Sequence, residues 1–412
     1  MTTGKDRKIL RRLAAEVRRI AETTEQARRR RLWLDHNSLN SERPLILCFP
    51  EGAWNELIPD SELKCADPRM RAWEWNLRSK IYAWETIRDD SPIEPWFDVN
   101  WRINYGDYGV EVPMRHGKNR GSYKWNPPVK DIPRDMPLLK FRRPSVDRKS
   151  THEECELGRD IFDGILPVRI RGGHWWTMGL TWEAILLVGL EEMMLLMCEA
   201  PADMHRLMAW LRDEHLNFIE WFESEGMLNL NNGADYVGSG GVGYTSELPA
   251  VGNPPGGPVR LKDLWGLGES QETAGVSPGM FSEFILPYQI PLLEKFGLNC
   301  YGCCESLDSR IDHVLKVPRL RRVSVAPWAD QELMAKRLAN RFVFSRKPNP
   351  ALICTSFNED EIRKDLRRTL EIAGEGSLEI IMKDTHTVQN QPWRISRWVE
   401  IAKEEVDRYM RT

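Results

Sequence analysis

The chain has 412 residues, of which 29% are charged and 41% hydrophobic, and a net charge of −3. This length is common for a single α/β barrel, and the near-neutral charge argues against nucleic acid or anionic lipid as a partner. The longest apolar stretch, Ala184–Leu190, ends at Glu191 and is far shorter than the roughly 20 residues that cross a membrane. Met1–Leu13 is charged and lacks a secretory-signal pattern, so we expect a cytoplasmic protein.

The first half of the chain mixes helices with long loops. Residues 5–31 carry apolar side chains at helical spacing and predict a helix, whereas the apolar run at 44–49 predicts a strand. Residues 60–90 favour a second helix, and residues 91–150 are rich in Pro, Gly and Trp, which is typical of loops. The pattern next predicts a strand at 168–170, helices at 181–200 and 202–225, and glycine-rich loops at 236–244 and 252–258.

The last third alternates short apolar runs with amphipathic segments. Ser277 and Pro278 predict the start of a helix over 277–296. Strand–helix–strand units at this spacing are the signature of a parallel sheet, and four in succession favour a (β/α)8 TIM barrel. A doubly wound open sheet is the alternative, although no GxGxxG motif follows a strand. The predicted strands are 298–303, 322–326, 342–345 and 378–382, and the predicted helices are 306–316, 330–340, 358–373 and one after Pro392.

We expect residues 1–42 to form an N-terminal helical extension and residues 43–412 to form the barrel, with long loop insertions. In a parallel barrel the functional residues follow the C-terminal ends of the strands. This rule selects four neighbouring segments at one mouth, which are Cys303–Glu305, Ala326–Trp328, Ser345–Pro350 and Lys383–His386.

Thiolate, carboxylate and imidazole groups would meet at that mouth. Catalytic zinc sites commonly take three protein ligands of these types and leave one position open. We therefore expect Cys303, Glu305 and His386 to hold zinc, with Cys304 able to replace Cys303, because successive strand residues face opposite sides. In the alternative interpretation both cysteines fill the core as small apolar groups and His386 only forms a hydrogen bond.

Two further carboxylates, Glu269 and Glu272, follow a glycine-containing turn. They are candidates for acid–base chemistry, metal binding or contact with a cationic substrate, and equally for plain helix-terminal acids. The tryptophans near glycines and prolines suit an aromatic-lined ligand pocket or, with equal weight, a protein interface. The predicted catalytic residues are Glu269, Glu272 and His386, and the predicted substrate-binding residues are Trp54, His174, Trp176, Trp265, Tyr301, Trp328, Lys347 and Asn349.

From about Pro44 to the end, several stretches together are similar to one known group. They are Arg43–Trp54, Leu264–Glu272, Ser277–Pro278, Leu286–Tyr288, Asn299–Glu305, Arg322–Trp328, Ser345–Pro350 and Lys383–His386. In these stretches the chain resembles the uroporphyrinogen decarboxylase-like superfamily, and most closely a divergent bacterial branch near the corrinoid-dependent methyltransferases. The resemblance implies a (β/α)8 barrel and a homodimer.

The methyltransferase members of that superfamily carry a His-x-Cys zinc motif on the strand that matches 298–304, and a further cysteine after the last strand. Here the motif region reads Gly302-Cys303-Cys304-Glu305, and His386 lies where the distal ligand is expected. The resemblance implies an enzyme that moves a methyl group between a small methylated substrate and a corrinoid, with zinc as cofactor. Because no cobalamin-binding pattern is visible, we expect a separate protein to carry the corrinoid.

Two other functions remain as alternatives. Porphyrinogen decarboxylases hold their substrate carboxylates with an arginine-rich segment after the first strand. The matching segment, Cys48–Trp54, has no arginine, and Glu51 would repel a polyanionic substrate, so decarboxylation of a carboxylated substrate ranks second. The third interpretation is a non-catalytic barrel that binds a ligand at its tryptophan-rich mouth.

Overall fold

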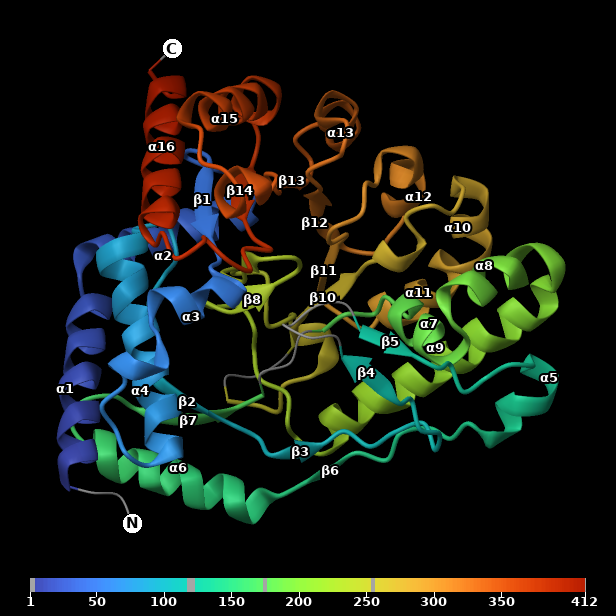
Figure 1. Ribbon diagram of the computed structural model, residues 1–412, viewed down its shortest axis with the longest axis horizontal. Coiled ribbons are helices and arrows are strands. Elements are labelled where there is room, and N and C mark those ends of the chain that lie inside the picture. Colours follow the sequence, from blue (N-terminus) through green and yellow to red (C-terminus); the bar gives the residue numbers. More distant parts are fainter. Residues whose placement is uncertain (1–3, 117–122, 173–175, 253–255, 412) are drawn as a thin grey trace.

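A computed structural model describes residues 4–116, 123–172, 176–252 and 256–411. Its centre is a six-stranded sheet in which every neighbouring pair of strands is parallel. Figure 1 shows these strands in an arc, with helices along its outer side. The strands follow the order β1 (Leu45–Cys48), β14 (Leu378–Met382), β13 (Val343–Arg346), β12 (Leu320–Val325), β11 (Leu298–Tyr301) and β10 (Trp265–Gly268).

Strand residues alternate between the two faces of this sheet, as the period of two requires. Ile46 and Ile380 pack in the large core against the outer helices, whereas Leu47 and Ile381 pack on the concave side. Ser277 caps the first outer helix by accepting a hydrogen bond from the Met280 backbone N–H, as the sequence predicted. The helices that connect or follow these strands are α10 (Pro278–Phe284), α11 (Leu286–Leu293), α12 (Ile311–Val314), α13 (Gln331–Leu338), α14 (Ala351–Cys354), α15 (Glu359–Ala373) and α16 (Trp393–Tyr409).

The predicted barrel is present only in part, because the described residues form an open arc of six strands and no closed ring. Beyond β1, the carboxylates of Asp89 and Asp90 accept hydrogen bonds from the backbone N–H groups of Cys48 and Ile46. The Asp90 backbone N–H also donates to the Ile46 carbonyl, so this edge of β1 is hydrogen-bonded by the segment at 89–90, and no strand of the described residues pairs with it. Beyond β10, a single parallel bridge joins Thr177 to Leu267.

A hairpin fills the concave side of the arc. It consists of β8 (Tyr236–Val237) and β9 (Gly241–Val242), which the sequence analysis expected to be a loop. Val237 packs with residues of β10 and β11, and Val242 packs with residues of β1 and β14. In Figure 1 the label β8 lies inside the arc of strands. The hairpin therefore occupies the volume that side chains alone fill in a regular barrel.

The N-terminal region builds a second core, at the lower left of Figure 1. The helix predicted at 5–31 is broken, because Thr23 caps a new helix by accepting a hydrogen bond from the Gln26 backbone N–H. The elements of this region are α1 (Gly4–Ala21), α2 (Thr24–Asn37), α4 (Pro68–Tyr82) and α6 (Arg148–Phe162), with β2 (Phe97–Asn100) paired in parallel to β7 (Val168–Arg171).

Three other predicted helices differ from the structure. The helix at 181–200 is split at Gly189, whose φ of 95° no helical residue adopts. The helix at 277–296 is interrupted at Ile285, and that at 306–316 keeps only a turn before α12. Within the described ranges, none of the helices combines the length and the apolar character that a membrane span requires. The remaining elements are α3 (Trp54–Leu57), α5 (Ile132–Asp135), α7 (Thr181–Val188), α8 (Leu190–Glu199), α9 (Pro201–Ser224), β3 (Ile103–Asn104), β4 (Met114–His116), β5 (Tyr123–Trp125), β6 (Ser145–Val146) and the single turns η1 (Glu51–Ala53), η2 (Asp60–Glu62), η3 (Ala83–Ile87), η4 (Met136–Leu138), η5 (Leu261–Asp263), η6 (Gln271–Thr273) and η7 (Asp308–Arg310).

Candidate active site at the C-terminal ends of the strands

Reactive side chains gather at the edge where the parallel strands end. Glu269 follows β10, Cys303 and Cys304 follow β11, Lys347 follows β13, and Lys383 follows β14. The C-terminal ends of parallel strands lie at one edge of the sheet, which is the edge that carries the active sites of α/β barrels. We call this edge the rim.

The two adjacent thiols lie at the centre of the rim. The Cys303 Sγ is 3.6 Å from the Cys304 Sγ; Cys303 is buried and Cys304 is exposed. Gly302 has a φ of 92°, and a Cβ there would lie 2.7 Å from a methyl group of Leu307, so this tight turn requires glycine. The turn ends the strand alternation. The two sulfurs therefore approach one another, whereas the sequence pattern placed them on opposite faces.

The surroundings of Cys303 favour its thiolate form. A hydrogen bond from Cys304 lowers the pKa of Cys303 to about 6 against the effect of burial, and Lys383 and Ser239 act in the same direction. The Lys383 Nζ lies 4.0 Å from the Cys303 Sγ, and the Ser239 hydroxyl donates to it at 3.4 Å. Lys383 also donates to the Ser239 Oγ at 3.2 Å. The thiolate is the form of cysteine that binds metals and attacks electrophiles.

Ser239 reaches Cys303 because the hairpin packs unusually close to the sheet. A Cβ on Gly238 would lie 2.8 Å from the Cys300 Sγ, and a Cβ on Gly241 would lie 2.4 Å from the Cζ of Arg322. Glycine is required at both positions for this approach. Sequence reasoning missed Ser239 and Lys383 as partners of the thiol. The signal that could have found the hairpin is the run Gly238–Gly241, which suits a backbone pressed against a sheet.

Glu305 lies beside the thiols, with its carboxylate turned toward the backbone. It accepts hydrogen bonds from the N–H groups of Cys303 and Ser270, both at 2.9 Å. Burial raises the pKa of Glu305 to about 7, although these hydrogen bonds favour the charged form. In this arrangement Glu305 ties the turn after β11 to the turn after β10.

Glu269 and Glu272 come from the turn after β10. Burial raises the pKa of Glu269 well above its usual value, and the negative charges of Glu305 and Glu272 add to the effect. Glu269 accepts a hydrogen bond from the Thr177 hydroxyl at 3.2 Å, and Glu272 accepts one from Thr181 at 2.6 Å. These surroundings favour the protonated form of Glu269, which is the form that can donate a proton.

A buried charge network lies beneath the rim, on the concave side of the sheet. The Arg322 Nε is 2.8 Å from one Glu379 oxygen, and the His36 Nε2 is 3.2 Å from the other. Ser345 donates to Glu379 and accepts from the Lys347 Nζ at 2.5 Å. Burial lowers the pKa of Lys347 to about 7, although Glu379 opposes that effect. The network joins β12, β13 and β14 to the end of α2. The sequence pattern predicted these strands but not the buried charges between them.

The donor set at the rim differs from the predicted zinc ligands. Among the described residues, one group of three side chains offers ligand atoms within 4.8 Å of one another, and it consists of Glu51, Asp384 and His386. The Cys304 Sγ lies 3.6 Å from the Asp384 Oδ2, so this group continues into the thiol pair. His386 is thus placed near Asp384 and Glu51, while the Glu305 carboxylate is held by backbone N–H groups.

The separation of the two sulfurs is the feature of this edge that suits tetrahedral zinc. Zinc–sulfur bonds of about 2.3 Å set two thiolate ligands roughly 3.8 Å apart. The observed separation of the Cys303 and Cys304 sulfurs is 3.6 Å, and the Cys304 sulfur is the same distance from Asp384. Neither sulfur belongs to the group of Glu51, Asp384 and His386, so among the described residues the thiol pair and that group are neighbouring but separate sets of possible ligands.

The predicted substrate-binding residues are scattered around the molecule. Trp54 packs in α3 with its ring 5.8 Å from that of Trp75. Trp265 faces the hairpin and donates its indole N–H to the Gly243 carbonyl. Tyr301 is buried on the helix side of β11, where its hydroxyl donates to Gln289, so it does not reach the rim.

The other predicted residues differ in their exposure. Trp328 is 70% exposed after β12, and Lys347 is buried under the rim. Asn349 accepts a hydrogen bond from the Ala351 backbone N–H. Trp176 lines an aromatic cavity, whereas His174 lies outside the described residues.

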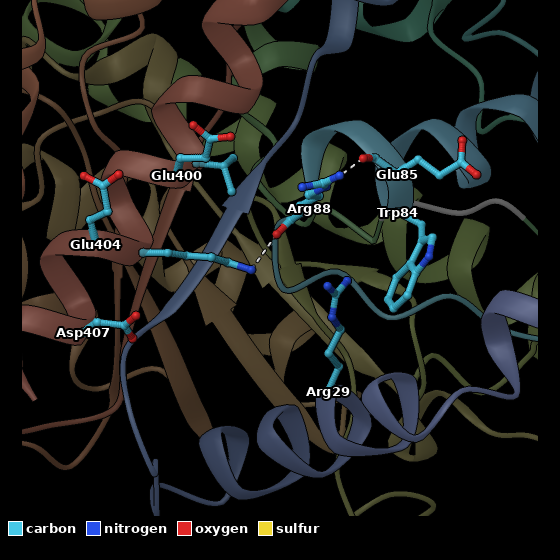
Figure 2. Close-up of a pocket in the computed structure, with 9 residues that line it drawn as sticks. Arg29, Trp84, Glu85, Arg88, Glu400, Glu404 and Asp407 are labelled. Atoms are coloured by element: carbon cyan, nitrogen blue, oxygen red, sulfur yellow. Dashed lines mark hydrogen bonds between the residues drawn. The ribbon is translucent and has the colours of Figure 1, made fainter.

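A large cavity of about 810 Å³ lies away from the rim, between α2, η3 and α16. Figure 2 shows that charged side chains surround it, among them Arg29, Arg88 and Glu404. Several of these charges already have partners: Glu404 pairs with Arg363, and the Arg29 guanidinium lies over the Trp84 ring. None of the cavity's lining residues belongs to the rim.

No protein-family model matches this sequence, and no curated protein matches it. Among solved structures, the chain is similar to a methyltransferase from Methanosarcina mazei. The two share 10% sequence identity with a TM-score of 0.49, over 91% of this chain and 97% of that chain. This likeness is too distant to indicate a shared activity.

Proposed function

We propose that this protein is a methyltransferase that moves a methyl group between a small methylated substrate and a corrinoid carried by a separate protein. The observation that carries the proposal is the thiol pair at the rim. Cys303 has a lowered pKa, and its sulfur lies 3.6 Å from that of Cys304 at the C-terminal end of β11. A thiolate and a carboxyl that favours its protonated form, at one edge of the sheet, can support methyl transfer from a heteroatom by metal binding and proton donation.

Zinc is the cofactor of this proposal. Cys303, Cys304, Asp384 and His386 would hold it once the metal draws these neighbouring donors together, because thiolate, carboxylate and imidazole are the ligands that zinc prefers. Bound there, zinc would act as a Lewis acid on the heteroatom that carries the methyl group. The hydrogen bond from Cys304, and with it the charge of Lys383 4.0 Å from the Cys303 sulfur, lower the pKa of Cys303 and favour its thiolate.

Glu269 would supply the proton in this reaction. When the methyl carbon leaves an oxygen or nitrogen of the substrate, the bonding electron pair stays on that atom and takes up a proton. Burial and the charges of Glu305 and Glu272 raise the pKa of Glu269 and so favour its protonated form. Thr177 donates to the Glu269 Oε1 and so fixes the direction of the carboxyl group.

The experiment is methyl transfer to reduced cobalamin, followed through the change in the visible spectrum of the corrinoid. The zinc-loaded protein should form methylcobalamin from a methylated donor, Cys303→Ala should abolish the reaction, and Cys198→Ala, at an exposed cysteine on α8, should leave it unchanged. Methylation that survives in Cys303→Ala would contradict the proposal. Release of carbon dioxide from a carboxylated substrate without any corrinoid would instead indicate the decarboxylase. The homodimer and the cytoplasmic setting stay predictions.

A further inference from the structure

The two thiols at the rim are close enough to react with one another as well as with a metal. The Cys303 and Cys304 sulfurs are 3.6 Å apart, and either can donate a hydrogen bond to the other. Cys300, the nearest further cysteine in the sequence, packs on the concave side of β11, with its sulfur 3.7 Å from the Arg322 guanidinium. The contact therefore selects Cys303 and Cys304 for bond formation with each other.

A small reagent can reach this pair through Cys304. The Cys304 side chain is exposed, whereas Cys303 is only 4% exposed. On its buried side the Cys303 sulfur accepts a hydrogen bond from the Ser239 hydroxyl at 3.4 Å, and the Lys383 Nζ lies 4.0 Å away. One sulfur is therefore open to solvent, and the protein holds the other sulfur against it.

The backbone of Cys303 is fixed on both sides. Its N–H donates to the Glu305 carboxylate at 2.9 Å, and its carbonyl accepts a hydrogen bond from the Ser324 hydroxyl at 2.8 Å. Adjacent residues have Cα atoms about 3.8 Å apart, which is less than the roughly 4.4–6.8 Å that most disulfides span. A disulfide between neighbours is therefore strained, and closing it here has to turn the peptide that Ser324 holds. Strained disulfides are easily reduced, so oxidation of this pair would be reversible.

We propose that Cys303 and Cys304 form a site of reversible oxidative modification, at which a peroxide joins the two sulfurs as a disulfide. The modification itself does not depend on the proposed function, but its effect on catalysis rests on that function. Because only a thiolate binds metal, the disulfide removes both sulfur ligands of the proposed zinc site. The oxidised protein should therefore lose methyl transfer, and a dithiol reductant should restore it.

The reaction balances with hydrogen peroxide as the oxidant. The exposed Cys304 sulfur bonds to one peroxide oxygen, the oxygen–oxygen bond breaks, and the other oxygen takes the Cys304 proton and leaves as water. The Cys303 sulfur then bonds to the Cys304 sulfur and displaces the remaining oxygen, which takes the Cys303 proton and leaves as a second water. The two sulfurs together give up two electrons, and these reduce the peroxide.

Peptide mapping tests the modification. Protein as purified is treated with hydrogen peroxide, its free thiols are alkylated with iodoacetamide in denaturant, and trypsin then yields one peptide over residues 296–310, which contains Cys300, Cys303 and Cys304. This peptide should carry an alkyl group on every cysteine before oxidation and only on Cys300 after it. Treatment with dithiothreitol before alkylation should restore the other two groups.

Two variants accompany the wild type, and thermal melting verifies that each is folded. Cys198→Ala removes an exposed cysteine on α8 and should form the disulfide as the wild type does. Cys304→Ser should form none. Full alkylation of the wild-type peptide after peroxide, oxidation that dithiothreitol does not reverse, or a disulfide that still forms in Cys304→Ser would overturn the proposal.

Release of zinc, followed with a coloured chelator, separates this modification from the proposed function. Zinc-loaded protein should release its metal as the disulfide forms. If the disulfide forms while zinc stays bound and methyl transfer continues, the modification stands and the proposed use of the thiols in catalysis fails. If the protein binds zinc through the thiols and transfers methyl groups but forms no disulfide with peroxide, the proposed function stands and this assignment fails.

Discussion

Replacing Glu379 with Gln should cost about 3–5 kcal/mol of unfolding free energy, because it leaves a buried arginine without its counter-ion. Glu379 is fully buried and Arg322 is 1% exposed, with 2.8 Å between the nearest nitrogen and oxygen. After the substitution the Arg322 guanidinium keeps only neutral acceptors near it, such as the Asn37 side chain at 2.6 Å. Solvent does not screen this pair, so the full cost of an unpaired buried charge applies.

The assay is urea unfolding followed by circular dichroism, for Glu379→Gln, Arg322→Met and the double variant. The double variant should lose about 2–3 kcal/mol less than the sum of the two single losses, because it leaves no unpaired charge. Glu220→Gln, which breaks the exposed pair with Lys295, is the control and should change stability by less than about 1 kcal/mol. A loss below about 1 kcal/mol for Glu379→Gln, or strictly additive losses, would refute the reasoning.

The same pair predicts a dependence on pH. Burial alone would raise the pKa of Glu379, but the charge of Arg322 and the hydrogen bond from His36 outweigh it and hold the pKa below its usual range. A carboxyl whose pKa is lowered in the folded state stabilises the protein above its unfolded pKa, and this stabilisation is lost as the pH falls. The stability difference between wild type and Glu379→Gln should therefore shrink in acid. A difference that grows in acid would contradict this assignment.

Three further predictions concern the hairpin and the rim. Gly241→Ala would put a Cβ 2.4 Å from the Arg322 guanidinium carbon and should destabilise the protein by about 1–3 kcal/mol in urea unfolding. An unchanged urea concentration at the unfolding midpoint would contradict the close packing of the hairpin against the sheet. Glu269→Gln should abolish methyl transfer. Because the pKa of Glu269 is raised in the folded state, the wild type should lose stability as the pH rises to that pKa, and the variant should become more stable relative to it. A stability difference that does not change with pH would contradict the raised pKa. Trp328→Ala should change the unfolding free energy by less than about 0.5 kcal/mol, since Trp328 is 70% exposed, and should raise KM if this ring covers the substrate; an unchanged KM would remove it from the site.

The C-terminal third of the fold was predictable because its signals are local. The predicted strand at 378–382 has the bounds of β14, and the helix predicted after Asn358 begins there because the Asn358 side chain accepts from two backbone N–H groups. Short apolar runs and capping residues can be recognised within a few neighbouring positions. The open edge at β1 was not predictable, because the side chains that bond to it, Asp89 and Asp90, lie more than forty residues later in the chain.

The sequence indicated where the candidate site lies, but only some of the residues that form it. The rule that strand ends carry function selected Cys303 and Cys304, and the glycine-containing turn at 264–272 separately indicated Glu269. It could not identify Ser239, because the sequence does not show that a glycine-rich loop folds back inside the sheet. The sequence also predicted Glu305 as a metal ligand. It could not show that two backbone N–H groups hold this carboxylate, because those groups come together only in the folded chain.

Zinc binding by the thiol pair tests the central claim most directly. X-ray absorption and elemental analysis of purified protein should show one zinc per chain with two sulfur ligands. The Cys303→Ala variant should lose the metal, whereas Cys198→Ala should keep it. Zinc with only nitrogen and oxygen ligands, or zinc retained in full by Cys303→Ala, would contradict the claim that the two sulfurs form the reactive centre.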